Sequence, residues 1–307
     1  MESVALGSIS GTRCETFNKK DIYYDDSCLP GIVKWVTIST LYCASMLWPP
    51  AQSVWGLMFS LMFSCLSSLT LYHFTCALSH GPGFLPPHWS PDDDRDRGKL
   101  QYCGQCQGYK APRSHHCRRC GRCVMKMDHH CPWINTCVGH HNHGHFVAFL
   151  ASAVTGCAMA TFCLAMSLYY GLNRTWYLYY GTGREPQVIL SLWSLLGALF
   201  GMGLALGVVI AVGMLLFFQV THLKLFVSQI NSLDNLQIKA ILKNQTGIED
   251  WIKEKADFRL RHSERKFQWP YDLGRKENLR QVLGLSCRPH GDGISWKLVE
   301  VRLRSLE

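Results

Sequence analysis

Four long runs of apolar residues constrain this chain more than any other feature. They cover residues 31–48, 53–78, 146–172 and 188–220. The last three contain no Asp, Glu, Lys or Arg, and the first contains only Lys34, whose long side chain can reach the membrane interface. About 20 helical residues cross a hydrocarbon core of about 30 Å. The runs therefore predict an all-α integral membrane protein with four transmembrane helices. Four buried helices of a soluble protein are the alternative.

Positive charge is concentrated outside these runs and predicts their orientation. Only 17% of the 307 residues are charged, yet the formal net charge is +9. The 79–145 loop carries nine Lys or Arg residues and the segment after 220 carries sixteen, whereas the connections 49–52 and 173–187 together carry two. The positive-inside rule then places residues 1–30, 79–145 and 221–307 in the cytosol. Because the polar first 30 residues lack a signal-peptide pattern, we expect 31–48 to be retained as a helix.

The 79–145 loop is dense in residues that bind metals. Seven of the 15 cysteines and eight of the 14 histidines lie between positions 103 and 145. On the reducing cytosolic side such usage indicates metal binding or catalysis rather than disulfides. Three cysteines and one histidine form a pattern that recurs fourteen residues later, first at Cys103, Cys106, His116 and Cys123, then at Cys117, Cys120, His130 and Cys137. These quartets match closed tetrahedral sites and predict two structural Zn²⁺ ions in a loop-rich, cysteine-rich domain.

Cys131 is the one cysteine of this loop that the two quartets leave unused. It follows Asp128, His129 and His130 directly. With His130 assigned to zinc, His129 is available as a base for the Cys131 thiol, and Asp128 can orient the imidazole. We therefore predict Cys131, His129 and Asp128 as catalytic residues. A spare or exchanging zinc ligand at Cys131 is the alternative.

Basic residues of the same loop are candidates for binding phosphate. Each quartet with its zinc has a net charge of −1, so the metal sites do not supply positive charge for a phosphate-bearing ligand. We expect that charge to come from the basic side chains between and beside the quartets, Arg113, Arg118, Arg119, Arg122 and Lys126.

Several other cysteines and histidines fall outside the quartets. His140, His141, His143 and His145 precede the third apolar run without an accompanying set of cysteines. We interpret them as ordinary residues at the entrance of the third helix, with a third metal site as the alternative. Cys14, Cys28 and Cys287 have no assigned role.

The loop resembles the cysteine-rich domain of the DHHC-type protein S-acyltransferases, or palmitoyltransferases. The similarity runs without a gap from Cys103 through the Asp128-His129-His130-Cys131 motif to Asn142 and Phe146, and the four apolar runs agree with the family layout. The text KAPRSHHCRRCGRCVMKMDHHCPWIN is similar to an endoplasmic-reticulum member found in animals. The resemblance implies a multi-pass protein of the endoplasmic reticulum, with the Golgi as the alternative.

The resemblance also implies an activity. In a ping-pong reaction Cys131 attacks a fatty acyl-CoA, such as palmitoyl-CoA, and the acyl group then passes to a cysteine of a substrate protein. The expected partners are acyl-CoA, the lipid bilayer, and membrane-associated proteins with cytosolic cysteines. The acyl chain is expected to lie among the four helices.

Further family motifs are matched in the tail, with departures. The family's Thr-Thr-x-Glu motif is represented by Thr246, Gly247 and Glu249, so we expect any contact from the second threonine's hydroxyl to the Asp-His pair to be absent. The aromatic-plus-asparagine motif is matched by Tyr271 and Asn278. Together with Asn142, these residues are predicted to support the site; an ordinary helix-face charge at Glu249 and a packing role for Tyr271 are the alternatives. The family's Asp-Pro-Gly motif reads Gly-Pro-Gly at 81–83.

Other function classes fit less well. A catalytically silent, zinc-stapled membrane adaptor would need the quartets but no ninth ligand-like residue beside a free histidine, and it stays the alternative. A nucleic-acid-binding role is excluded because the zinc loop lies between two spans and has no recognition-helix pattern. A transporter function is also disfavoured, because the apolar runs of this chain hold almost no ionisable residues. Sequons occur at Asn173 and Asn244, and the predicted orientation leaves Asn244 unglycosylated.

Overall fold

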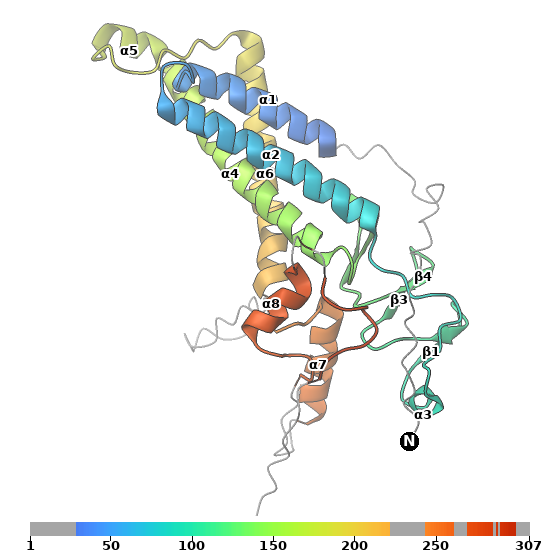
Figure 1. Cartoon of the computed structure of the whole chain (residues 1–307). Helices are drawn as coiled ribbons and strands as arrows, with labels where there is room; N and C mark the ends of the chain where they lie inside the picture. Colours follow the sequence, from blue (N-terminus) through green and yellow to red (C-terminus); the bar gives the residue numbers. More distant parts are fainter. Residues whose placement is uncertain (1–28, 222–242, 261–268, 285–286, 288, 299–307) are drawn as a thin grey trace, which may run out of the picture.

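The computed structural model describes residues 29–221, 243–260, 269–284, 287 and 289–298, with side chains left out at 217–221. Predictions for Cys14, Cys28 and nearly all of the N-terminal segment lie outside the described residues, as do parts of the tail. Four long helices dominate: α1 (Leu29–Leu47), α2 (Val54–His80), α4 (His143–Leu172) and α6 (Leu192–Thr221). They form an elongated bundle with the cysteine-rich segment at one end (Figure 1).

Three of these helices could cross a membrane by length and composition. They are α2, α4 and the Leu192–Leu216 part of α6. The helix α1 has 19 residues, several of them polar, and is not among the three found in the described part of the chain. The prediction of a mostly helical chain is confirmed, with three helices long and apolar enough to cross a membrane, and the four predicted spans stay a prediction.

The bundle is organised around α4, which contacts α1, α2 and α6. Val36, Phe63, Ala160 and Ala205, one from each long helix, meet in one buried cluster. The two alanines allow close approach of helix backbones, as small residues do in membrane bundles. In contrast, Leu61 on α2 and Ile210 on α6 point outward and are more than half exposed. Apolar side chains on the outside, with small residues at the helix contacts, fit a bundle surrounded by lipid.

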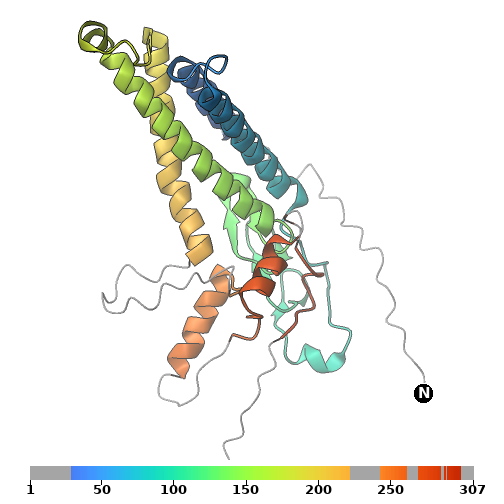
Figure 2. The same cartoon turned by 60° about the vertical axis from the view of Figure 1, so that its left-hand side comes forward.

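A tight connection joins α1 to α2. The hydroxyl of Ser53 caps α2 by accepting a 3.2 Å hydrogen bond from the Gly56 backbone N–H. A Cβ atom at Gly56 would lie only 2.0 Å from the Trp48 carbonyl oxygen, so this position requires glycine. At the same end of the bundle a short aromatic helix, α5 (Arg174–Tyr180), follows α4 (Figures 1 and 2). The connection 173–187 is therefore partly helical.

The cysteine-rich segment contains more regular structure than the predicted loops. A single-turn helix, α3 (Asp94–Arg97), is followed by three two-stranded antiparallel hairpins. The hairpins are β1 (Tyr102–Cys103) with β2 (Gly108–Tyr109), β3 (His115–Cys117) with β4 (Arg122–Val124), and β5 (His129–Cys131) with β6 (Thr136–Val138). Each strand has two or three residues, too few to produce an alternating pattern in the sequence. A 3₁₀ turn, η1 (Pro132–Ile134), connects β5 to β6.

Two helices of the tail lie beside the cysteine-rich segment. They are α7 (Gly247–Arg259) and α8 (Arg275–Leu283), and α8 packs against α4. Both views place them at the end of the bundle opposite α5 (Figures 1 and 2). The tail therefore reaches the segment that carries the DHHC motif.

Candidate active site and metal clusters

The two predicted quartets are both present as compact clusters that could hold a metal ion. In the first, the His116 Nδ1 atom lies 3.5, 3.3 and 3.9 Å from the sulfur atoms of Cys103, Cys106 and Cys123. In the second, the His130 Nδ1 atom lies 3.6, 3.4 and 3.6 Å from the sulfur atoms of Cys117, Cys120 and Cys137.

These separations fit a tetrahedral metal. With metal–sulfur and metal–nitrogen bonds of about 2.3 and 2.0–2.1 Å, ligand sulfur and nitrogen atoms lie about 3.6 Å apart. Three thiolates and one imidazole per cluster are also a donor set that zinc prefers. The residues therefore fit two structural metal ions.

The hairpins explain the fourteen-residue offset. In β3–β4, His116 is paired with Cys123, and in β5–β6, His130 is paired with Cys137. Each cluster thus takes its histidine and last cysteine from opposite positions of one hairpin. The other two cysteines of each cluster come from the hairpin before it, which is β1–β2 for the first cluster and β3–β4 for the second. The β3–β4 hairpin therefore contributes ligands to both clusters.

The β5 strand separates the metal ligand from the predicted catalytic residues. Side chains alternate between the two faces of a strand. His130 therefore points toward the metal cluster, whereas His129 and Cys131 share the other face. The thiol of Cys131 is hydrogen-bonded to the His129 imidazole. In the described part of the chain, Cys131 is the one cysteine between positions 103 and 137 that belongs to neither quartet.

Asp128 orients His129. Its Oδ2 atom accepts a 2.8 Å hydrogen bond from His129 Nδ1, and the Asp128 side chain is 6% exposed. Burial alone would lower the pKa of His129, but the hydrogen bonds and charges of Asp128 and Cys131 outweigh it and raise this pKa to about 9. The His129 imidazole therefore holds a proton at neutral pH, next to the sulfur of Cys131.

Cys131 lies where the cysteine-rich segment meets the helix bundle. Its side chain is buried in one apolar cluster with Phe74 from α2 and with Phe146 and Phe149 from α4. The His129 ring packs edge-on against Phe146, with 5.5 Å between ring centroids. The thiol therefore faces the apolar interior at one end of the bundle.

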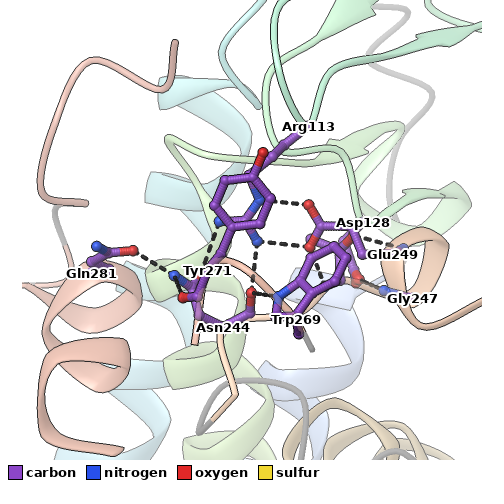
Figure 3. Close-up of polar contacts among 9 residues, drawn as sticks. Arg113, Asp128, Asn244, Gly247, Glu249, Trp269, Tyr271 and Gln281 are labelled. Atoms are coloured by element: carbon purple, nitrogen blue, oxygen red, sulfur yellow. Dashed lines mark hydrogen bonds and ion pairs between the residues drawn. The ribbon is translucent and has the colours of Figure 1, made fainter. Parts of the chain in front are cut away.

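The tail reaches this site directly. The backbone N–H of Gly247 donates a 2.7 Å hydrogen bond to Asp128 Oδ1 (Figure 3). We expected the contact of the family threonine to be lost at this position. The hydroxyl is indeed absent, but the main chain of Gly247 holds Asp128 in its place, because a backbone donor needs no side chain.

Comparison with known proteins agrees with this geometry. A sequence model of the DHHC palmitoyltransferase family matches residues 96–254, just over half of the chain. Palmitoyltransferase ZDHHC6 of Mus musculus is 42% identical over 270 residues, which are 83% of this chain and 61% of the relative. The Homo sapiens protein of the same name gives the same values. Probable protein S-acyltransferase 16 of Arabidopsis thaliana is 32% identical over 83% of this chain and 85% of its own length.

The chain belongs to the DHHC palmitoyltransferase family. It spans 61% of the length of the ZDHHC6 relatives. The DHHC residues of the family motif are Asp128, His129, His130 and Cys131.

Two residues of the cysteine-rich segment that were predicted to contact phosphate are buried in the structure. Arg113 is buried: its guanidinium pairs with the Glu249 carboxylate at 2.5 and 2.7 Å and donates to the Asn244 carbonyl at 2.8 Å (Figure 3). Lys126 is 2% exposed, with its amine 5.5 Å from the Trp296 ring centroid. Neither cation is available at the surface, because each is enclosed by the folded-back tail. Arg118 and Arg119 are exposed.

The predicted supporting residues of the tail form one buried network with Arg113. Thr246 caps α7 and forms a capping box with Glu249, which is 2% exposed. The Tyr271 ring lies against the Arg113 guanidinium, 4.6 Å from centroid to Cζ. The Asn278 amide holds the 271–274 turn by accepting from the Leu273 N–H and donating to Asp272. Glu249 is therefore more than an ordinary helix-face charge.

Asn142 fastens the cysteine-rich segment to the bundle. It is fully buried, accepts from the Gly139 N–H at 2.9 Å, and donates to the carbonyls of Ala77 and Cys137 at 3.1 and 3.0 Å. One side chain thus joins α2, the end of β6 and the start of α4. The predicted supporting role of Asn142 is structural in this geometry.

Sequence reasoning missed Asn244 and Trp296. Asn244 bonds Arg113, the Tyr271 carbonyl and the Gln281 side chain (Figure 3). The Trp296 ring covers the other side of Arg113 at 4.4 Å. Both lie more than 130 residues beyond Arg113, and no local pattern in the sequence points to these contacts.

Proposed function

We propose that this chain is a protein S-acyltransferase that transfers a long-chain fatty acyl group, such as palmitoyl, from acyl-CoA to cysteines of substrate proteins. The observation that carries the proposal is the placement of Cys131: outside both metal clusters, hydrogen-bonded to His129, and packed in the apolar cluster at the end of the bundle. A cysteine with a purely structural role would not need all three of these properties at once.

The reaction proceeds in two thioester exchanges. The Cys131 thiolate, paired with the protonated His129, attacks the thioester carbonyl carbon of acyl-CoA. A new carbon–sulfur bond forms, the bond to CoA breaks, and His129 returns the proton to the CoA sulfur. A substrate cysteine then attacks the acyl-Cys131 thioester in the same way, and the Cys131 thiol is regenerated.

Asp128 and His129 act as a pair. Asp128 fixes the imidazole by accepting a hydrogen bond from its Nδ1–H group, so that the other ring nitrogen faces the sulfur. The resulting imidazolium favours the nucleophilic thiolate form of Cys131, as a neighbouring charged histidine does for reactive cysteines. The Gly247 N–H keeps the Asp128 carboxylate in place.

The fatty chain and the phosphate groups of acyl-CoA would bind to different parts of the protein. The apolar cluster of Phe74, Phe146 and Phe149 lies beside Cys131 and supports placement of the fatty chain along the helices. The exposed guanidinium groups of Arg118 and Arg119 support phosphate binding on the outside of the cysteine-rich segment. When bound, zinc in the two quartets supplies structure, since all four ligand positions come from protein.

The membrane arrangement is part of the proposal. We infer four spans, α1, α2, α4 and α6, with the cysteine-rich segment and both ends of the chain in the cytosol. The short connections at 49–52 and 173–187 then face the lumen. The family resemblance implies the endoplasmic reticulum as the location, and membrane-associated proteins with cytosolic cysteines as substrates; the relatives are themselves named palmitoyltransferases.

A catalytically silent zinc-bound adaptor is the competing function. Labelling with a clickable fatty acid separates the two in cells that express the full chain. We expect hydroxylamine-sensitive label on wild type and on the Cys65→Ser control, and none on Cys131→Ser with its zinc content unchanged. Equal labelling of Cys131→Ser would refute the proposed nucleophile.

A further inference from the structure

A further group of metal-ligand side chains, beyond the two quartets, lies where the tail meets the start of α4. It belongs neither to the two quartets nor to the DHHC residues. Its members come from α2, α4 and the segment after α8, and they are His73, Cys76, His80, His145 and Cys287. We call this group the α2–α4 cluster.

Helical spacing gathers three of these residues on one stripe of α2. His73, Cys76 and His80 are three and four residues apart, and side chains at these spacings lie on the same helix face. His145 stands opposite them in the first turn of α4, where it is buried. Its ring stacks on His80 with centroids 5.1 Å apart.

The tail is held close enough to add a ligand. A Cβ atom at Gly144 would lie 2.7 Å from the Cys287 carbonyl oxygen and 2.8 Å from that of Val282, so the two backbones touch at this glycine. Cys287 itself has a φ of 59°, a left-handed conformation that non-glycine residues seldom adopt. This close approach brings Cys287 beside the neighbouring His145.

The distances fit a shared ion. The Nδ1 atoms of His73 and His145 are 3.1 Å apart. Two nitrogens bonded to one tetrahedral zinc at about 2.0–2.1 Å lie about 3.4 Å apart. The ligand atoms of His73, His145 and Cys287 all lie within 4.8 Å of one another, as do those of Cys76, His80 and His145.

We propose that His73, His145 and Cys287 bind a third metal ion of the zinc class and supply three of its ligands. Two imidazoles and a thiolate suit Zn²⁺ and exclude hard cations such as Mg²⁺ or Ca²⁺. The ion fastens the tail to α2 and α4 beside the apolar cluster that contains Cys131. It thereby extends the metal-bound framework from the cysteine-rich segment into the bundle itself.

Metal analysis of the purified full chain in detergent, after equilibration with Zn²⁺ and removal of excess, tests the proposal. We expect about three zinc ions per chain for wild type and for Cys65→Ser, whose exposed cysteine on α2 lies outside the cluster. His73→Gln and Cys287→Ser should each lose about one of the three. Two ions in wild type would mean that His73 and His145 form only a hydrogen bond between imidazoles, and would overturn the proposal.

Alkylation of the zinc-loaded protein, mapped by mass spectrometry, shows which site loses its ion. In His73→Gln, Cys287 should become more reactive than in wild type while Cys120 and Cys137 stay protected. Unchanged reactivity of Cys287 would contradict the proposal. Loss of protection at Cys120 and Cys137 would assign the missing ion to a quartet and contradict it as well.

Discussion

The backbone N–H of Gly247 donates a 2.7 Å hydrogen bond to Oδ1 of Asp128, 119 residues earlier in the chain. It is the first N–H of α7, capped by Thr246. The tail thus presents a helix N-terminus to the carboxylate that orients His129. Negative charge at this end of a helix is stabilised both by the free N–H groups and by the helix dipole.

Replacing Gly247 by proline removes this donor while keeping the helix. Proline is well tolerated at the first helical position, and Thr246 already has the extended conformation that a residue before proline prefers. Hydrogen bonds to charged groups contribute about 1.5–3 kcal/mol, so we expect acyl-enzyme formation to slow about tenfold or more. Single-turnover acylation with palmitoyl-CoA measures this rate. Gly247→Ala, which retains the N–H, should stay near the wild-type rate; equal slowing in both variants would contradict the role of the donor.

The Arg113–Glu249 pair should be important for stability because both side chains are nearly inaccessible, at 1% and 3% exposure. Arg113→Met leaves the Glu249 charge buried and unpaired, which costs about 3–5 kcal/mol. Denaturant unfolding in detergent should show this loss, and Arg113→Met/Glu249→Gln should cost less than the sum of the single changes. The exposed pair Arg97–Asp94 is the matched control, for which Arg97→Met should cost under about 1 kcal/mol. Similar losses at the two pairs would show that burial of the Arg113–Glu249 pair does not make it more important than an exposed pair.

The buried Lys126 side chain should make the free energy of unfolding depend on pH in an unusual way. Burial, helped by the charge of Arg113 and opposed by Glu249 and Asp128, lowers the pKa of Lys126 to about 7. In the unfolded chain a lysine has a pKa of about 10.4. Folding therefore disfavours the protonated amine, and this cost is greatest below about pH 7 and vanishes above the unfolded pKa.

Lys126→Met should accordingly stabilise the protein at pH 7 and lose this advantage near pH 10. The thermal unfolding midpoints of wild type and variant, compared at both pH values, provide the test. Arg118→Met, which changes an exposed cation, should show no such pH-dependent difference. A variant that is less stable than wild type at pH 7 would show that Lys126 is stabilised by its surroundings.

The inferred topology predicts where sugar can be added. Asn244 is 1% exposed and its Nδ2 atom donates to the Tyr271 carbonyl, so its sequon should stay unmodified in the folded chain. A sequon introduced in the 181–187 connection should be glycosylated in the endoplasmic reticulum, giving an endoglycosidase-sensitive gel shift. Sugar on Asn244 would place the tail in the lumen.

How much the sequence could predict depended on the distance between contacting residues. The two metal clusters were predicted correctly because each set of ligands spans about twenty residues and repeats with a constant offset. The DHHC neighbourhood followed from the same count, since Cys131 was the cysteine left over. The long helices were evident from apolar composition, although α1 is too polar to be found among the three candidate spans.

Contacts between distant segments were beyond sequence reasoning. Arg113 looked like one more surface cation in a basic loop, yet it is enclosed by Glu249 and Trp296 once the tail folds back. The Gly247 contact was missed because it uses a backbone atom, which every residue type except proline provides. The α2–α4 cluster was likewise not seen, because His73, His145 and Cys287 come from three separate elements.

Mass spectrometry of the purified chain after a single turnover with palmitoyl-CoA tests the central claim most directly. Peptide mapping under non-reducing, mildly acidic conditions locates the thioester. We predict a palmitoyl group on the peptide that contains Cys131, removed by neutral hydroxylamine and absent from Cys131→Ser. A palmitoyl group on a different cysteine, with Cys131 protected as a zinc ligand, would contradict the account.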